Sequence, residues 1–212
     1  MTEPDPATSH NRPNPARTAL HWAEMDARRQ SLQEFFHTNL PSGTEFVWEI
    51  GCGHGHFLTA YAQAFSDRYC LGIDTSSDRI ERGARKAARA GLKNLHFVHT
   101  EAELFLTQLP PAARLRDVFI LFPDPWPKKR HHKNRIVRAD FLTALAKRAG
   151  RGTHLYFRTD YTPYLEEVRQ ILRSHADWEL ADVAWPFEYE TVFQSRADSF
   201  GSLIARRRTA PA

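Results

Sequence analysis

The sequence predicts an α/β fold: a doubly wound, Rossmann-like sheet with helices on both faces. Short apolar runs alternate with helical segments along most of the chain, which is the order expected of β-α units in a parallel sheet. The run 118–122 is apolar at every position, as in a central strand buried on both faces. A glycine-rich loop follows the first of these runs, where sheets of this class bind their ligands.

The N-terminal part of the chain predicts a tail and one helix. Residues 1–17 hold four prolines and few apolar side chains, so we expect a flexible tail there. A helix is expected at 18–39, because apolar side chains recur at loosely helical spacing before the helix-ending stretch "LPSG". At this length the remainder, 18–212, is expected to form a single domain.

Strands and helices then alternate. Apolar runs predict strands, at 46–50, 68–74, 94–100, 117–122 and 153–159. The segments between and after them predict helices, at 57–64, 78–90, 101–109, 139–148 and 163–175. Two further strands are expected at 178–185 and 201–208. The sheet is therefore expected to be mostly parallel, with an antiparallel last strand.

The composition is that of a globular protein outside the membrane. Hydrophobic residues make up 42% of the chain and charged residues 25%, which is ordinary for a soluble domain. No apolar run approaches the roughly 20 residues that span a bilayer, and the tail lacks the apolar stretch of a signal peptide. Cys52 and Cys70 form no disulfide or metal-ligand pattern. We expect a cytoplasmic protein with no membrane partner and no metal.

The positive charge is concentrated in one segment. The chain has a net charge of +4, and the stretch 123–138 holds six basic residues against one acid, Asp124. A local excess of this kind indicates an anion-binding surface. The alternative is a solvated face with no ligand.

The loop "EIGCGHG" carries glycines at Gly51, Gly53 and Gly55. Glycine permits a tight strand-to-helix turn and lets a ligand approach bare backbone amides. A nicotinamide fingerprint would need a glycine where this chain has His56. The missing glycine argues against a dinucleotide ligand. The alternative is that the three glycines form only a tight turn.

Three acids stand near the ends of the first three predicted strands: Glu49, Asp74 and Glu101. Carboxylates there suit ribose hydroxyls, an amino group and a cationic centre, whereas they would repel a pyrophosphate. Acids at these positions can also simply cap the next helix, and for Glu101 both interpretations stay open.

At this point the chain resembles the class I S-adenosylmethionine-dependent methyltransferases. The longer string "PDPWPKKRHHK" is more specific and is similar to the signature of the bacterial tRNA (guanine-N7)-methyltransferases. The resemblance covers about residues 20–207. It implies a Rossmann-like methyltransferase sheet, S-adenosyl-L-methionine as cofactor, tRNA as partner, and guanosine 46 of the tRNA variable loop as methyl acceptor.

The resemblance also implies roles for individual residues. It assigns the cofactor to the glycine loop and the acids, namely Glu49, Gly51, Gly53, Gly55, Asp74, Glu101 and Asp124. It places the target nucleotide against Lys128 and Asp160, and RNA against Lys129, Arg130, His131, His132, Lys133 and Arg135. Asp124 matches the proposed catalytic position.

Chemistry independently favours a role for Asp124. Guanine N7 carries a free lone pair, so catalysis needs positioning and stabilisation of developing positive charge rather than removal of a proton. A carboxylate held between Pro123 and Pro125 could do this or could accept hydrogen bonds from the guanine edge, and both roles stay open. Trp126 could stack on an extruded base or simply pack beneath the loop. His131 and His132 have no partner residues at metal-ligand spacing.

One motif departs from the family pattern. The family usually carries T-K-F-E near its C-terminus, where this chain has Thr191, Val192, Phe193 and Gln194. We expect these four residues to contact the substrate, but the change leaves the acceptor open. The alternatives are a methyltransferase paralogue that acts on a different RNA guanosine and a non-catalytic RNA-binding paralogue. The sequence is compatible with a monomer or a homodimer.

Overall fold

The computed structural model describes residues 15–191 and 193–208, with side chains from residue 23 onward. Seven strands form one sheet in the order β3-β2-β1-β4-β5-β7-β6. The strands are β1 (Glu45–Ile50), β2 (Tyr69–Asp74), β3 (Leu95–His99), β4 (Arg114–Leu121), β5 (Ala149–Thr159), β6 (Trp178–Leu180) and β7 (Gly201–Arg207). The first five pair in parallel and β7 pairs antiparallel with both neighbours. The predicted mixed sheet is confirmed.

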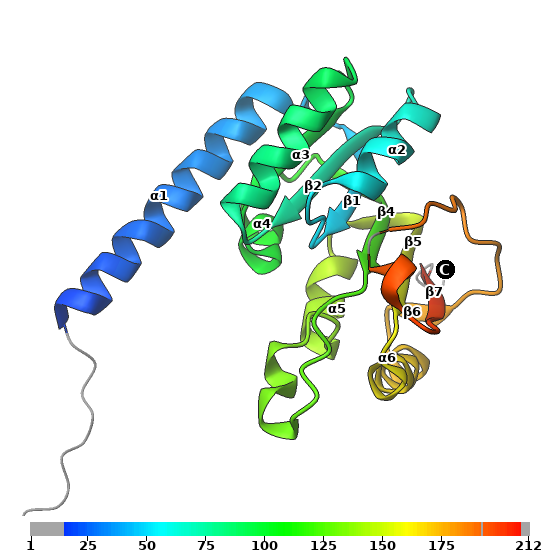
Figure 1. Ribbon diagram of the computed structural model, residues 1–212. Helices are drawn as coiled ribbons and strands as arrows, with labels where there is room; N and C mark the ends of the chain where they lie inside the picture. The colour runs from blue at the N-terminus through cyan, green and yellow to red at the C-terminus, as the bar shows by residue number, and fades with distance from the viewer. Residues whose placement is uncertain (1–14, 192, 209–212) are drawn as a thin grey trace, which may run out of the picture.

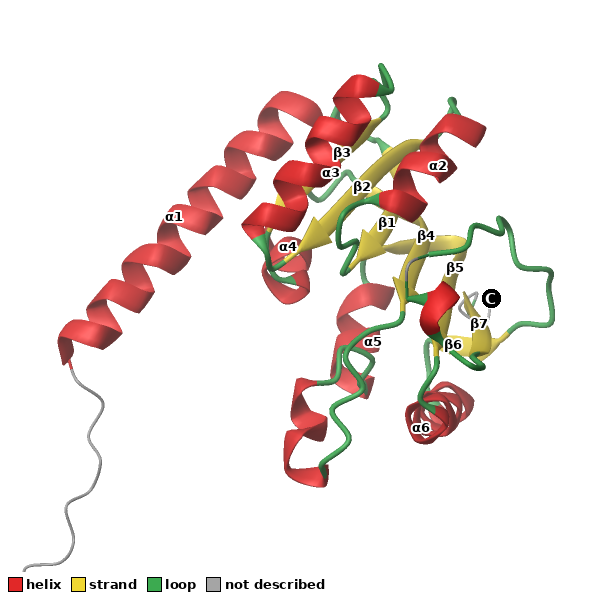
Figure 2. Ribbon diagram, viewed as in Figure 1, coloured by secondary structure: helices red, strands yellow, loops and turns green. Residues whose placement is uncertain are grey.

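The helices cover both faces of this sheet (Figures 1 and 2). They are α1 (Pro15–Asn39), α2 (His56–Ala64), α3 (Ser77–Arg89), α4 (Ala102–Gln108), α5 (Ala139–Ala146) and α6 (Thr162–Ser174). Two buried clusters result, because alternate residues of a strand point to opposite faces. Phe46 and Trp48 of β1 join the cluster of α1, α4, α5 and α6, whereas Val47 joins that of α2 and α3.

The topology fixes where a ligand can bind. β1 lies between β2 and β4, so the chain leaves β1 in one direction along the sheet and later returns to its other side. This is a topological switch point, and open α/β sheets bind ligands beyond the carboxyl ends of the strands that flank it. The glycine loop leaves β1 there, and the segment 122–128 leaves β4 beside it.

Two local expectations were wrong, and one element was not predicted. α1 begins at Pro15, so it includes the last three residues of the predicted tail; proline is compatible with the first turn of a helix. β6 ends at Leu180 rather than continuing to residue 185, because the following segment leaves the sheet edge and packs Trp185, Phe187 and Tyr189 against the α2 side of the sheet. The basic segment, to which the sequence analysis assigned no helix or strand, contains the 3-10 helix η1 (Lys129–Asn134).

Two further observations concern the described residues. None of their helices combines the length and apolarity that a bilayer crossing requires. Cys52 and Cys70 are both free, buried thiols.

Candidate functional site

The glycine loop is held in left-handed backbone conformations, with φ of +72° at Gly51, +54° at Gly53 and +67° at Gly55. At Gly55 a second constraint applies, because an added Cβ would lie 2.3 Å from the Phe97 ring. Residues other than glycine rarely adopt a positive φ. The loop therefore turns tightly over the end of β1 and leads directly into α2.

Asp74 fastens this loop to the end of β2. Its carboxylate is 6% exposed and accepts hydrogen bonds from the backbone amides of Gly53 at 3.0 Å and Ser76 at 2.9 Å. Each oxygen takes one amide and keeps a second lone pair. Arg79 of α3 lies 3.7 Å from one of these oxygens. Asp74 thus organises the loop and can still accept hydrogen bonds from a ligand.

Glu49 is a buried acid beneath the same loop. Burial raises the pKa of its carboxyl to about 8; a backbone hydrogen bond from Leu58 opposes the rise and the nearby Asp74 adds to it. The oxygen Oε2 is buried and has no hydrogen-bond partner among the described residues. Glu49 also lines a cavity of about 230 Å³. A cationic group entering this cavity would satisfy the unpaired oxygen.

A larger cavity of about 550 Å³ opens over the carboxyl ends of β1, β2 and β4. Its walls bring together the residues predicted to bind a ligand, including Gly51, Gly53, Asp74, Glu101, Asp124 and Phe193. This volume lies within the usual range for a small-molecule site. Gly55 and Glu49 lie outside this lining: Gly55 packs against Phe97, and Glu49 faces the smaller neighbouring cavity.

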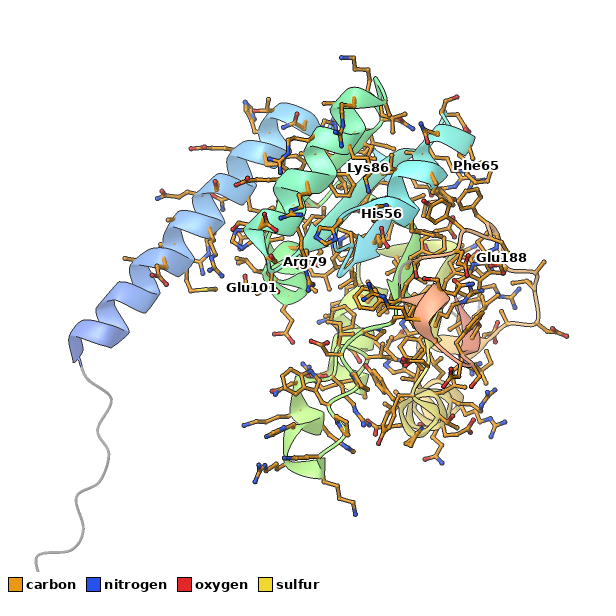
Figure 3. The ribbon with its side chains drawn as sticks, viewed as in Figure 1. His56, Phe65, Arg79, Lys86, Glu101 and Glu188 are labelled. Carbon is orange, nitrogen blue, oxygen red and sulfur yellow. The ribbon has the colours of Figure 1, made fainter. Side chains whose placement is uncertain are left out.

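Glu101 does not cap α4 with its side chain, although it occupies the cap position. Its Oε1 instead pairs with Arg28 of α1, while Oε2 is buried without a hydrogen-bond partner among the described residues. Figure 3 labels Glu101 near the start of α4, close to α1. The capping alternative is thus excluded for the side chain, and the free oxygen belongs to a carboxylate in the cavity wall.

The loop that carries Asp124 is held in a strained conformation. Phe122 and Trp126 adopt φ of +51° and +43°, a region that residues other than glycine avoid. The amide of Phe122 donates to the carbonyl of Arg158 at 2.7 Å. Between the two strained residues Asp124 is exposed and lines the large cavity. The backbone therefore presents this carboxylate to whatever occupies the cavity.

Trp126 has contacts that fit both of its interpretations. Its ring meets His131 edge to face, with 5.8 Å between ring centroids. The side chain is only half-buried and also lines the large cavity. Packing against η1 therefore leaves part of Trp126 available to a ligand.

The basic segment presents most, but not all, of its charge to solvent. Lys128, Lys129, Arg130 and Lys133 are exposed, whereas His131 and His132 are half-buried. The Nδ1 atom of His132 lies 3.5 Å from Glu167 of α6. No group of three or more potential metal ligands occurs in the described part of the chain.

Arg135 differs from the expectation of an RNA contact. It is 1% exposed, pairs with Glu167, and lies 4.7 Å above the Tyr164 ring. Its Nε donates to the carbonyl of Pro125 at 2.8 Å. A guanidinium buried in this way is a structural support of the Asp124 loop and is not offered to RNA.

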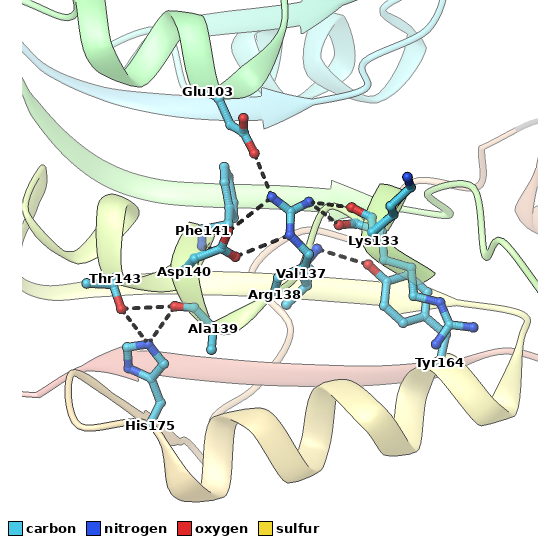
Figure 4. Close-up of polar contacts among 11 residues, drawn as sticks. Glu103, Lys133, Val137, Arg138, Ala139, Asp140, Phe141, Thr143, Tyr164 and His175 are labelled. Carbon is cyan, nitrogen blue, oxygen red and sulfur yellow. Dashed lines mark hydrogen bonds and ion pairs between the residues drawn. The ribbon is translucent and has the colours of Figure 1, made fainter. Parts of the chain in front are cut away.

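Arg138 fixes the far end of the basic segment (Figure 4). Its guanidinium pairs with Glu103 of α4 at 2.6 Å and with Asp140 of α5 at 3.2 Å. It also donates to the carbonyls of Lys133 at 3.2 Å and Arg135 at 2.8 Å. Arg138 thus anchors the C-terminal end of η1 to α4 and α5.

The C-terminal motif reaches the same site. Phe193 is 56% exposed and lines both cavities, and Thr191 lines the smaller one. Gln194 accepts a hydrogen bond from Arg158 at 3.2 Å. Val192 lies outside the described residues. Lys128 and Asp160 are exposed, and neither is part of either cavity wall.

Comparison with protein families decides what kind of protein carries this site. The model of a family described as "Putative methyltransferase" matches residues 44–197, which include the glycine loop, the Asp124 loop and η1. The chain belongs to this methyltransferase family. The predicted membership of a methyltransferase family is therefore confirmed.

Two curated relatives of this chain carry the name tRNA (guanine-N(7)-)-methyltransferase. The relative from Nitrosococcus oceani is 36% identical over 62% of this chain and 56% of its own length. The relative from Streptomyces avermitilis is 33% identical over 74% of this chain and 52% of its own length. The chain thus spans about half the length of the curated relatives it matches.

Solved methyltransferase structures have the same fold. The 16S rRNA methyltransferase KamB superposes with a TM-score of 0.58 at 18% identity, over 87% of this chain and 94% of KamB. The aminoglycoside resistance methyltransferase NpmB1 gives 0.56 at 18% identity, over 83% and 93%. At these identities the likeness concerns the fold alone.

Sequence reasoning missed three arginines in or beside this candidate site: Arg79, Arg138 and Arg158. Arg79 and Arg138 line the large cavity, but both stand in basic stretches where nothing marks them out. Arg158 was detectable, since it is a lone charge inside the apolar run "LYFRT". A charge in a buried strand requires a partner, which here is Glu188.

Proposed function

We propose that this protein is an S-adenosylmethionine-dependent tRNA (guanine-N7-)-methyltransferase that modifies guanosine 46 of the tRNA variable loop. One observation carries the proposal: Asp124 lines the same cavity as the glycine loop and Asp74, and the exposed bases of η1 follow directly in the chain. A methyl donor, an acceptor base and an RNA backbone would then meet at one place. The name shared by the curated relatives supports this choice of acceptor.

The residues present fit the cofactor. Asp74 retains lone pairs for the hydroxyls of a ribose, and the unpaired Oε2 of Glu49 suits an ammonium group. The left-handed glycines bring backbone close to the bound molecule without intervening side chains. When bound, S-adenosylmethionine supplies an electrophilic methyl group on a sulfonium.

The proposed work of the protein is positioning and charge stabilisation. N7 of guanine attacks with its own lone pair, so no general base has to remove a proton first. The base gains a positive charge as the methyl group arrives, and a fixed carboxylate at Asp124 would stabilise it. The exposed lysine and arginine side chains of η1 would bind the phosphates of the RNA and so keep the target guanine in position.

A second candidate is the same chemistry on another RNA guanosine. The observation that favours it is Gln194, which stands where the family pattern has an acid and is engaged by Arg158. A purely RNA-binding role is disfavoured, because such a protein would not need the cavity or the unpaired oxygen of Glu49.

The test uses two unmodified tRNA transcripts that differ only in the variable-loop guanosine, one of them carrying adenosine instead. We expect methyl transfer to the first alone, with N7-methylguanosine mapped there by chemical cleavage. Equal transfer to both transcripts would favour the second candidate. Cofactor binding without transfer to any tRNA would contradict the first candidate.

A matched pair of variants tests the role of Asp124. In single-turnover assays Asp124→Asn should transfer methyl about 10²- to 10³-fold more slowly while binding tRNA normally. The control is Asp67→Asn, an exposed acid in the loop before β2, which should transfer at the normal rate.

A further inference from the structure

A second basic surface lies on the other side of the glycine loop from η1. It is a hollow of about 390 Å³ between the glycine loop, the start of α2 and one face of α3, here called the α3 groove. Every residue that lines it is basic: His54, His56, Arg82, Arg85, Lys86 and Arg89. A concave surface lined by basic residues has a positive potential that attracts anions.

Helical spacing aligns the basic side chains of α3 in this groove. Arg82, Lys86 and Arg89 are separated by four and three residues, so they share one face of the helix. Among the described residues, Arg82 and Arg85 pair only with exposed acids, Asp78 at 3.0 Å and Glu81 at 3.5 Å. Pairs of this kind are weak and screened by salt, so they leave both guanidinium groups available to a stronger anion.

Lys86 and His56 form the floor of the groove. The Lys86 ammonium lies 2.7 Å from Nδ1 of His56 and donates to the carbonyl of His54 at 3.1 Å. Figure 3 shows the two side chains between α3 and α2. Partial burial lowers the pKa of both groups, and the positive charge of Lys86 lowers that of His56 further. An anion bound beside them would raise both pKa values, because it favours the charged form of each group.

The groove adjoins the proposed active site. His54 and His56 line both the groove and the smaller cavity that contains Glu49. η1 follows β4 and α3 follows β2, and these strands flank β1 on either side. Along the sheet, the cavity with Asp124 therefore lies between η1 on one side and the α3 groove on the other.

We propose that the α3 groove binds phosphates of the RNA substrate and forms a second anchor beside the one at η1. This inference rests on the proposed function for the identity of the RNA. In this proposal one RNA molecule contacts both η1 and the α3 groove, and its target guanine lies between them. Phosphodiester groups suit the site because arginine and lysine together supply a row of donors and a positive potential.

The test compares tRNA binding by the full chain and by Lys86→Gln/Arg89→Gln over a range of salt concentrations. Loss of two phosphate contacts should weaken binding about tenfold at low salt and reduce the slope of log K against log salt by roughly one to two. Affinity for S-adenosylmethionine should not change. The matched control, Lys147→Gln/Arg151→Gln, removes two exposed charges, one just after α5 and one in β5, and should keep the wild-type slope.

A single variant guards against a folding artefact. Arg89 is exposed and has no recorded ion pair in the described part of the chain, so Arg89→Gln should fold normally and still lower the slope. An unchanged slope in Arg89→Gln and in the double variant, with wild-type tRNA methylation intact, would overturn the inference and leave the proposed function standing. A lowered slope in a protein that methylates no tRNA would support the groove and contradict the proposed function. Binding of inorganic phosphate in the groove, with no effect of the variants on RNA binding, would also overturn the groove proposal.

Discussion

Arg135 supports the Asp124 loop from below, through a hydrogen bond of 2.8 Å from its Nε to the carbonyl of Pro125. The same guanidinium donates to the carbonyl of Trp126 and pairs with Glu167 of α6. The loop between two positive-φ residues is therefore tied to a helix on the far side of the buried arginine. Its geometry depends on a residue that does not itself line the cavity.

Replacing Arg135 should impair both stability and positioning. Arg135→Gln leaves two loop carbonyls and Glu167 without their donor, so we expect a loss of about 2–4 kcal/mol in urea unfolding. Arg135→Lys keeps the charge but not the fork of donors, and should recover only part of the stability. In both variants kcat should fall more than cofactor affinity. The control Arg173→Gln, an exposed arginine of α6, should leave both stability and kcat unchanged; equal losses in it would contradict the assignment.

The sequence predicted the sheet because its signals are local and repeated. The continuous apolar run 118–122 predicts a buried strand, and the glycine loop predicts a tight turn. Neither prediction needs information from distant parts of the chain. The roles of Arg135 and Glu101 were not predictable in this way. Their partners, Glu167 and Arg28, lie far along the chain, and only the folded arrangement shows that one arginine is buried and that one acid is paired rather than capping.

Glu49 should make cofactor affinity depend on pH. Its folded pKa is about 8, so at neutral pH it is mostly protonated, and a bound ammonium would favour the ionised form and release a proton. Affinity for S-adenosylmethionine should therefore rise from pH 6 toward pH 8. Calorimetry in buffers of different ionisation enthalpy measures the released proton directly. Glu49→Gln should bind more weakly and lose the rise; a rise that persists in Glu49→Gln would assign it to another group.

The same carboxyl affects the stability of the unliganded protein with the opposite trend. The folded state retains this proton above pH 4.5, the ordinary pKa of the group, whereas the unfolded state loses it. The contribution to stability is thus complete below the unfolded pKa and is lost as pH rises to about 8. Glu49→Gln should remove this part of the pH dependence in urea unfolding, so the difference between variant and wild type should grow in favour of the variant over that interval.

Gly55 and Gly91 form a matched pair for testing the glycine loop. Both have nearly the same φ, +67° and +68°, but an added Cβ at Gly55 meets Phe97 at 2.3 Å, whereas at Gly91 nothing lies within 4 Å. Gly91→Ala should lose about 1 kcal/mol from backbone strain alone. Gly55→Ala should lose clearly more and also weaken cofactor binding. Equal unfolding midpoints for the two variants would mean that the Phe97 contact relaxes freely.

Arg158 joins the C-terminal motif to β5. Its guanidinium, buried at the side-chain level to 6% exposure, holds Glu188 through two hydrogen bonds of 3.1 Å and Gln194 through one of 3.2 Å. It also lies 4.0 Å above the Trp185 ring. Because this buried cation has one recorded carboxylate partner among the described residues, the segment that carries Thr191 and Phe193 should be ordered largely by Glu188.

Glu188→Gln should therefore loosen this segment without unfolding the sheet. We expect faster hydrogen exchange at residues 185–191 and 193–196, a stability loss of about 1–2 kcal/mol, and a higher KM for RNA with little change in cofactor affinity. Glu190→Gln, which removes an exposed acid from the same segment, is the control. The double variant Glu188→Gln/Gln194→Glu moves the carboxylate to the other side of Arg158 and should restore exchange protection. If it does not, the position of the acid, rather than its charge, orders the segment.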